Sequence, residues 1–252
     1  MVLAAFGEWI APNPSAQDLA TGVAGPSAAH WLGTDDLGRD VLARLIVGAR
    51  TAVLGPVLIT LGSALIGTLL GLLAGYVGGL SDSVILRWAD LMFALPGQLV
   101  AIVVVGVLGG GYFLAVAILI VLSSPYDTRL IRAATLEQRP RAYIEAARVL
   151  GLPGRRVAMA HLLPNLVPLI IASVFLGFAY ALLALAALSF LGLGVGAGTP
   201  DWGRMLAEGR TLLFKNPAAA LAPGAMLILT AASMNLVGDW LAERLSDRGR
   251  AR

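Results

Sequence analysis

The residues best suited to specific chemistry in this chain lie in one charged segment, 143–165, between two strongly apolar blocks. Glu145 offers a carboxylate to a basic partner. The small side chains of Ala146 and Ala147 would let another protein's surface approach closely, and Gly151 lets the chain reverse without a steric penalty. This combination indicates docking to a partner rather than catalysis.

The local sequence predicts a short, stiff helix in this segment. Good helix formers run from Arg141 to Leu150, and Gly151 with Pro153 would end the helix sharply. An alternative remains open, because any loop between membrane helices can contain a polar helix, and Glu145 would then be merely solvated.

Other kinds of chemistry have little support. The chain has no cysteine and only two histidines, His30 and His161, which excludes disulfides, thiolate metal sites and a His-rich metal cage. Its one lysine, Lys215, lacks the glycines of a phosphate-binding P-loop. We therefore expect no metal, cofactor or catalytic residue in this chain, and ATP would bind a partner.

Composition places the chain in a membrane, since 58% of its residues are hydrophobic, 13% are charged and the mean hydropathy is +0.83. Four stretches lack Asp, Glu, Lys and Arg: 51–81, 91–126, 157–200 and 216–238. A helix needs about 20 apolar residues to cross the hydrocarbon core. Glycines 109–111 divide the second stretch into helices over about 89–108 and 112–135, and only about 166–191 of the third stretch crosses. The prediction is five complete crossings.

The predicted helix centres hold only Ser, Thr, Asn or Gln as polar residues, so they offer no carrier for proton or sodium coupling. Asp90 and Asp239 are expected near cytoplasmic helix ends.

The amino terminus, residues 1–11, is apolar except for Glu8 but too short to cross a bilayer, and we interpret it as the remnant of a truncated first helix. Twelve of the 18 arginine and lysine residues fall on the side that holds the 137–165 loop and the carboxy-terminal tail, 244–252. The positive-inside rule therefore predicts that this side is cytoplasmic.

The segment 12–50 then faces outward. Thr34 could cap a helix whose first turn holds Asp35 and Asp36. Apolar residues from Leu37 to Ala49 share one face, with Arg39, Asp40 and Arg44 on another, which predicts an amphipathic helix along the membrane interface.

Several motifs together resemble one protein family. They are Trp31 to Arg50, Gly75 to Gly79 followed by Asp82, Arg87, Asp90 and Pro96, Glu145-Ala146-Ala147 with Gly151 and Leu163-Pro164-Asn165, Thr199 to Leu206, and Asn235 to Leu241. From Trp31 onward the chain resembles the permease subunits of bacterial ABC importers, specifically the dipeptide, oligopeptide and nickel transport family of binding-protein-dependent inner membrane components.

The resemblance implies an all-α fold, a polytopic membrane helix bundle of the type I importer class with a cytoplasmic coupling helix. It implies a permease domain over 51–243, within which the 137–165 loop docks to the ATPases. The implied ATPase-docking residues are Glu145, Ala146, Ala147, Arg148, Gly151, Leu163, Pro164 and Asn165. Asp201, Trp202 and Gly203 are candidates for an outer gate or a binding-protein contact, although aromatic residues are also common membrane-interface anchors.

The implied partners are a homologous permease, two cytoplasmic ABC ATPases that hold ATP and Mg²⁺, an extracytoplasmic solute-binding protein and the lipid membrane, but no nucleic acid. We expect dipeptides or oligopeptides as substrates and nickel less, because the chain lacks suitable ligands. The main alternative is a stand-alone secondary carrier or channel, which would need no docking helix. A membrane scaffold that translocates nothing is a weaker alternative.

Overall fold

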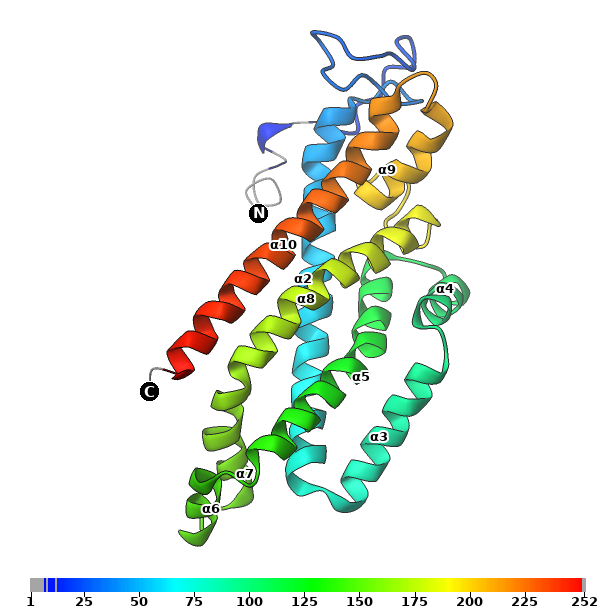
Figure 1. Ribbon diagram of the computed structural model, residues 1–252. Helices are drawn as coiled ribbons and strands as arrows, with labels where there is room; N and C mark the ends of the chain where they lie inside the picture. Colours follow the sequence, from blue (N-terminus) through cyan, green and yellow to red (C-terminus); the bar gives the residue numbers. More distant parts are fainter. Residues whose placement is uncertain (1–6, 8, 12, 251–252) are drawn as a thin grey trace. The chain divides into compact units, whose positions relative to one another are not determined.

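The computed structural model describes residue 7, residues 9–11 and residues 13–250. The regular structure of these residues is helical, apart from one isolated β-bridge between Thr34 and Asp40, and residues 13–40 form turns and coil before the first long helix (Figure 1). The α-helices are α2 (Val41–Leu72), α3 (Gly79–Ala94), α4 (Gly97–Val107), α5 (Tyr112–Gln138), α6 (Ala142–Val149), α7 (Gly154–Val157), α8 (Leu163–Phe190), α9 (Trp202–Gly209) and α10 (Pro217–Arg250). Short π-helices, η1 (Leu73–Val77) and η2 (Ala158–Leu162), and a 3₁₀-helix, η3 (Arg210–Leu212), extend three of them.

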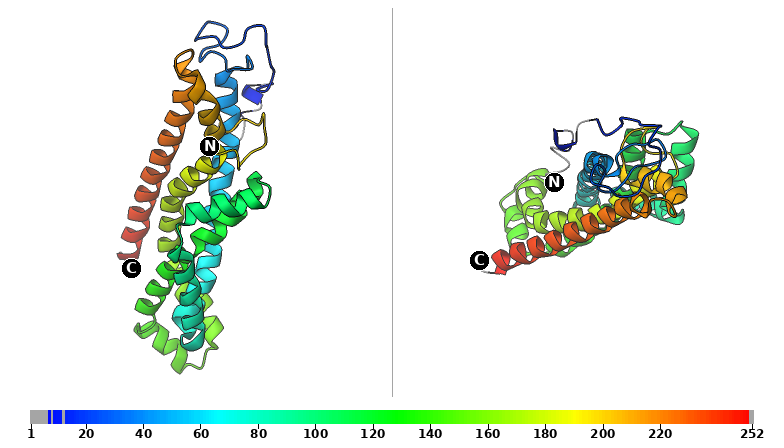
Figure 2. Two further views of the ribbon diagram at one scale, coloured as in Figure 1. Left: turned by 90° about the vertical axis from the view of Figure 1, so that its right-hand side faces the viewer. Right: turned by 90° about the horizontal axis from the view of Figure 1, so that it is seen from above.

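Four helical stretches of the described chain are long and apolar enough to cross a membrane, and the figures draw each as a long ribbon (Figures 1 and 2). They are Val41–Val77, Tyr112–Gln138, Gly154–Phe190 and Pro217–Leu241. A fifth crossing exists if α3 and α4 together count as one span. The all-helical membrane architecture is therefore confirmed. The predicted amino-terminal remnant falls largely on residues 1–6 and 8, outside the described part of the chain.

The prediction of one continuous helix over 89–108 was wrong. The chain instead forms α3 and α4, which meet at an angle of 83°. Leu95 between them is extended, with φ −110° and ψ 142°. Pro96 explains the break, because proline excludes the helical conformation from the residue before it and cannot donate a backbone hydrogen bond.

The predicted interfacial helix beginning at Thr34 was also wrong. Thr34 instead forms the isolated β-bridge with Asp40, and its hydroxyl donates to the carbonyl of Gly22 at 2.7 Å. Gly38 has a φ of +71°, which interrupts any helix there. The helix begins only at Val41, where the Asp40 carboxylate accepts from the Ala43 amide at 2.8 Å, and it continues as α2 into the first span.

Glycines end a helix sharply both within the Gly75 to Gly79 motif and at glycines 109–111. Gly78 and Gly79 have φ values of +74° and +61°, and Gly109, Gly110 and Gly111 also have positive φ. L-residues rarely adopt this conformation, so glycine allows each span to end within a few residues of the next helix.

The chain forms two compact units. The first unit comprises the described parts of 1–58, together with 101–119 and 178–233. Its loops are tied together by polar contacts: the Asn216 side-chain amide donates to the carbonyls of Leu32 at 2.9 Å and Thr34 at 3.1 Å.

The second unit comprises 59–100, 120–177 and the described part of 234–252. Within it, Gly67, Gly71 and Gly75 form a stripe on α2 and η1 that faces α5, and a Cβ at any of them would collide with α5 atoms. Small residues at this spacing let two membrane helices approach closely. The sequence pattern Gly-x₃-Gly-x₃-Gly could have predicted this contact.

Candidate functional site

The short helix predicted over 141–150 is confirmed as α6, Ala142–Val149. Arg141 precedes it in an extended conformation, and Leu150 follows it as the C-cap. Gly151 has a φ of +73°, and its amide donates to the Arg148 carbonyl at 2.9 Å. The helix is one residue shorter at each end than expected, because Arg141 and Leu150 serve as its flanking residues.

One face of α6 is packed into the second unit. Ile144 is fully buried and Ala147 is 5% exposed. They join a core that also contains Leu72 at the end of α2, Ile131 of α5, Val157 of α7, Leu162 of η2 and Leu166 of α8. The helix is therefore firmly attached to elements that lead into three membrane spans. Ala147, whose small side chain was expected to let a partner's surface approach, packs its methyl group into this core.

The opposite face of α6 is exposed and carries Glu145, Ala146 and Arg148. Val149 and Leu150 at its end are 87% and 79% exposed, which makes an apolar tip that the motif analysis missed. Two consecutive apolar residues directly before Gly151 were the available signal. Exposed apolar side chains beside charged ones are typical of protein–protein contacts.

Arg148 does not extend freely from this face. Its guanidinium carbon lies 5.1 Å from the centroid of the Tyr76 ring, at cation–π distance. Arg148 therefore helps to hold α6 against η1 in addition to facing outward.

The remaining predicted docking residues lie in a continuous run of helix rather than in a loop. Leu163 is half-buried against the α6 core, whereas Pro164 and Asn165 are exposed. The Asn165 amide donates to the His161 carbonyl at 2.6 Å. The structure brings Leu163 and α6 together, and it leaves Pro164 and Asn165 on the surface of the same unit.

The second set of candidates, Asp201, Trp202 and Gly203, begins α9 in the first unit, and it is buried. Trp202 is 2% exposed and its indole donates to the Leu45 carbonyl at 2.8 Å. A Cβ at Gly203 would collide with the Ala186 carbonyl oxygen. In this structure these residues present no free surface to a partner or to lipid headgroups.

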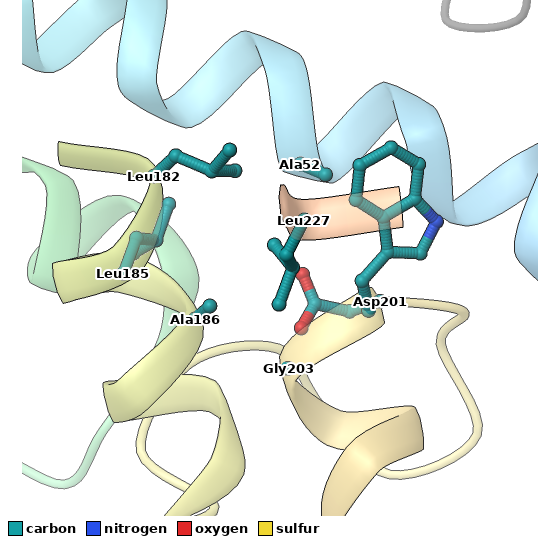
Figure 3. Close-up of a pocket in the computed structure, with 8 residues that line it drawn as sticks. Ala52, Leu182, Leu185, Ala186, Asp201, Gly203 and Leu227 are labelled. Carbon is teal, nitrogen blue, oxygen red and sulfur yellow. The ribbon is translucent and has the colours of Figure 1, made fainter. Parts of the chain in front are cut away.

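Asp201 caps α9, accepting from the Arg204 amide at 3.1 Å. Its carboxyl lines a small pocket among apolar side chains of three helices (Figure 3). The other lining residues are Ala52, Leu182, Leu185, Ala186, Trp202, Gly203 and Leu227. Burial raises the pKa of Asp201 above its usual value, despite the hydrogen bonds that favour the charged form.

A buried ion-pair network holds α9 to α2 and to the segment before it, and sequence analysis missed it. Asp35 accepts from Arg39 at 2.7 Å and from Arg44 at 2.5 Å. Glu208 of α9 lies 2.8 Å from Arg44 and 3.0 Å from Arg204. Arg39 and Arg44, expected on a solvated polar face, are thus buried. Only the Asp35–Arg39 spacing was visible in the sequence, because Glu208 lies far along the chain.

Ionisable residues also lie within the α5 span, which corrects the expectation of uncharged helix centres. Asp127 is 7% exposed and lies against α2 at Gly67. Arg132 forms a two-point ion pair with Asp82 of α3, with Nε and Nη2 at 2.5 and 2.7 Å from the carboxylate oxygens. The charge-free stretch ended at Tyr126, but the helix continues to Gln138, so these residues were assigned to its end rather than to its length.

The described residues contain no group of three or more His, Cys, Asp or Glu side chains that could hold a metal ion. The arrangement instead offers membrane-length helices and a short, rigidly mounted helix with an exposed face. This defines a polytopic helical membrane protein with one exposed helix face outside its spans.

Comparison with known proteins agrees with this class. Residues 67–250 match the family model described as "Binding-protein-dependent transport system inner membrane component". The glutathione transport permease GsiD of Pectobacterium atrosepticum and the dipeptide transport permease DppC of Alkalihalophilus pseudofirmus are each 39% identical over 224 residues, covering 89% of this chain and 74% of theirs. The probable D,D-dipeptide transport permease DdpC of Escherichia coli K12 is 33% identical, covering 98% and 84%.

A chain of the inward-facing MetNI methionine ABC transporter has the same fold, with a TM-score of 0.65, 17% identity and coverage of 81% of this chain and 96% of that one. The chain belongs to the family of binding-protein-dependent transport inner membrane components. It is a multi-pass, non-catalytic permease subunit of an ABC importer, and membership implies ATPase, permease and binding-protein partners.

Proposed function

We propose that this chain forms, with a homologous permease, the translocation path of an ATP-driven peptide importer. Two cytoplasmic ATPases would dock below it and a solute-binding protein would deliver peptides from above. The observation that supports this proposal most strongly is α6, a helix with one face built into the protein core and the other exposed.

The packing of α6 suggests how movement of the ATPases would be transmitted to the membrane spans. Ile144 and Ala147 pack against residues of α2, α5 and α8, so a displacement of α6 would move the cytoplasmic ends of these helices with it. Protein cores are close-packed and transmit strain rather than absorb it. Closure of the ATPases around ATP would thereby switch the spans between inward-facing and outward-facing arrangements.

The orientation in this proposal puts the 137–165 segment and the carboxy terminus in the cytoplasm, as the arginine distribution favours. The ATPase surface would be contacted by the apolar tip of α6, Val149 and Leu150, and by the exposed residues Glu145, Ala146, Arg148, Pro164 and Asn165. Gly151 would set the exit angle of the chain from α6. An outer gate would be affected only indirectly by Asp201, Trp202 and Gly203. These buried residues begin α9 and would set the position of that helix.

Peptides are the proposed substrate class because the relatives transport dipeptides, D,D-dipeptides and glutathione by their names. Within that class we favour dipeptides or oligopeptides. Nickel remains the less favoured cargo.

The test is affinity purification of the tagged chain from membranes, followed by identification of partners and an ATPase assay. Copurification of a second permease and ATPases is expected for the wild type and should be lost with Glu145→Ala. Glu137→Ala is the matched control, because Glu137 is also an exposed acidic residue, 72% exposed, just before α6. A folded wild-type protein that purifies alone and transports without ATPases would favour the stand-alone carrier.

A further inference from the structure

The break between α3 and α4 lies near the middle of Gly79–Val107, the bent helix pair that together is long and apolar enough to form one membrane span. Leu95, Pro96 and Gly97, which form the break, are all exposed. The last carbonyl groups of a helix lack partners within that helix. Hydrocarbon cannot satisfy them, so irregular backbone at membrane depth occurs only where protein covers it or where it lines a water-filled cavity. The break is therefore unsuited to a lipid-facing position.

A second observation concerns the same surface. Asp90 of α3 and Arg129 of α5 form an ion pair whose side chains are 64% and 44% exposed. Arg129 lies within the α5 span, and its guanidinium carbon is 4.5 Å from the centroid of the Phe93 ring. Charged groups within membrane spans are costly against lipid and usually face a partner or a water-filled cavity. The ion pair and the break thus independently indicate that this surface is covered by water or protein.

We propose that Asp90, Arg129 and Phe93, with the exposed segment 95–97, line the translocation path and bind the charged ends of a passing peptide. The proposal rests on the proposed peptide-import function. Asp90 offers a carboxylate to the peptide's ammonium group, and Arg129 offers guanidinium donors to its terminal carboxylate.

The chemistry of the surface favours a peptide over other occupants. An anionic lipid headgroup would favour a net positive site, whereas one acidic and one basic residue side by side match a zwitterion. Phe93 and Leu95 are 48% and 58% exposed and add apolar surface that tolerates different peptide side chains. The cation–π contact with Phe93 orients the guanidinium, and the Arg129 side chain remains 44% exposed.

The first experiment measures access of water to the break, using single cysteines in this cysteine-free chain. Leu95→Cys is compared with Leu65→Cys, an α2 position with a similar exposure of 63%. Both are placed in the complete importer in nanodiscs and treated with a charged, water-soluble thiol reagent. Leu95→Cys should react at least about 50-fold faster than Leu65→Cys, because the charged reagent would have to enter hydrocarbon to reach a lipid-facing cysteine, and that step is energetically costly. Equal labelling rates for Leu95→Cys and Leu65→Cys would overturn the assignment of this surface to the path. If both rates are slow, the partner permease covers the break instead.

The second experiment tests peptide-end recognition. A dipeptide with free ends should slow the labelling of Leu95→Cys several-fold, and the same peptide acetylated and amidated should not. Asp90→Asn and Arg129→Gln should remove this difference while the amount of copurified ATPase stays constant. Asp82→Asn is the matched control, because it breaks the half-buried α3–α5 ion pair without altering the exposed one.

The outcomes separate this inference from the proposed function. If the wild type imports peptides but free and blocked peptides act alike on labelling, end recognition is overturned and the importer function stands. If the wild type imports no peptide, the proposed substrate class fails and peptide-end recognition fails with it. The labelling comparison still decides whether this surface lines a path.

Discussion

The short helices α6 and α9 have the same length of eight residues but opposite surroundings. Helix α6 buries only Ile144 and Ala147 and exposes the rest of its residues. Helix α9 is packed on several sides, and its charged residues are engaged in an ion-pair network. An exposed, charged face on a firmly mounted helix remains available to a partner. A helix whose charges are satisfied internally instead holds its own unit together.

The largest expected effect is on the ion-pair network of α9, and it follows from replacing Arg44, which pairs with Glu208 of that helix. Arg44→Leu leaves the carboxylates of Asp35 and Glu208 without one of their buried partners, and breaking a buried pair typically costs about 3–5 kcal/mol. Thermal unfolding of the purified protein should show the loss. The exposed Arg210→Leu serves as control, and equal melting temperatures for the two variants would contradict a stabilising role for the network.

The buried face of α6 should be nearly as sensitive. Ile144→Ala removes a fully buried side chain from the core and should destabilise the second unit by about 2–5 kcal/mol. Because α6 would also be more loosely mounted, peptide transport per ATP hydrolysed should fall in importers that still assemble. Unchanged coupling at reduced stability would show that α6 need not be rigidly attached.

The exposed tip of α6 should affect binding without affecting stability. Val149→Ser alters a side chain that is 87% exposed, so the free energy of unfolding should change by less than about 0.5 kcal/mol. Affinity for the ATPase should fall by about fivefold, or about 1 kcal/mol. Val84→Ser, at a position 60% exposed on α3, should leave that affinity unchanged. Equal ATPase affinities for the two variants would remove the tip from the docking surface.

The smallest expected effect concerns pH and Asp201. Because the pKa of Asp201 is raised in the folded state, its protonated form is favoured there, and its contribution to stability declines as pH rises above about 3.8 through the folded pKa. Asp201→Asn should flatten this part of the stability–pH curve, measured by urea unfolding. Asp36→Asn, whose side chain is 54% exposed, is the control. A stability–pH curve that Asp201→Asn leaves unchanged would contradict a raised pKa of Asp201 in the folded state.

Local patterns determined much of the architecture. Apolar length predicted the spans, glycine runs predicted the reversals, and helix formers followed by Gly151 predicted α6, because each of these depends on neighbouring residues and on the solvent around them. The same reasoning failed at Thr34 and at the 89–108 stretch. At Thr34, the hydrogen bond of its hydroxyl to Gly22 outweighed the apolar periodicity. In the 89–108 stretch, the effect of Pro96 on the backbone of Leu95 did so.

The sequence by itself determined that this chain is a membrane helix bundle with a short polar helix between two spans, because hydropathy and helix-stop signals are local properties. Only the tertiary structure decided which residues of that helix are free, placing Ala147 in the core and Val149 outside it. It also joined Arg44 to Glu208 and Asp90 to Arg129 across long stretches of chain. Burial and ion pairing depend on which distant segments come together, and no local pattern in one sequence specifies that.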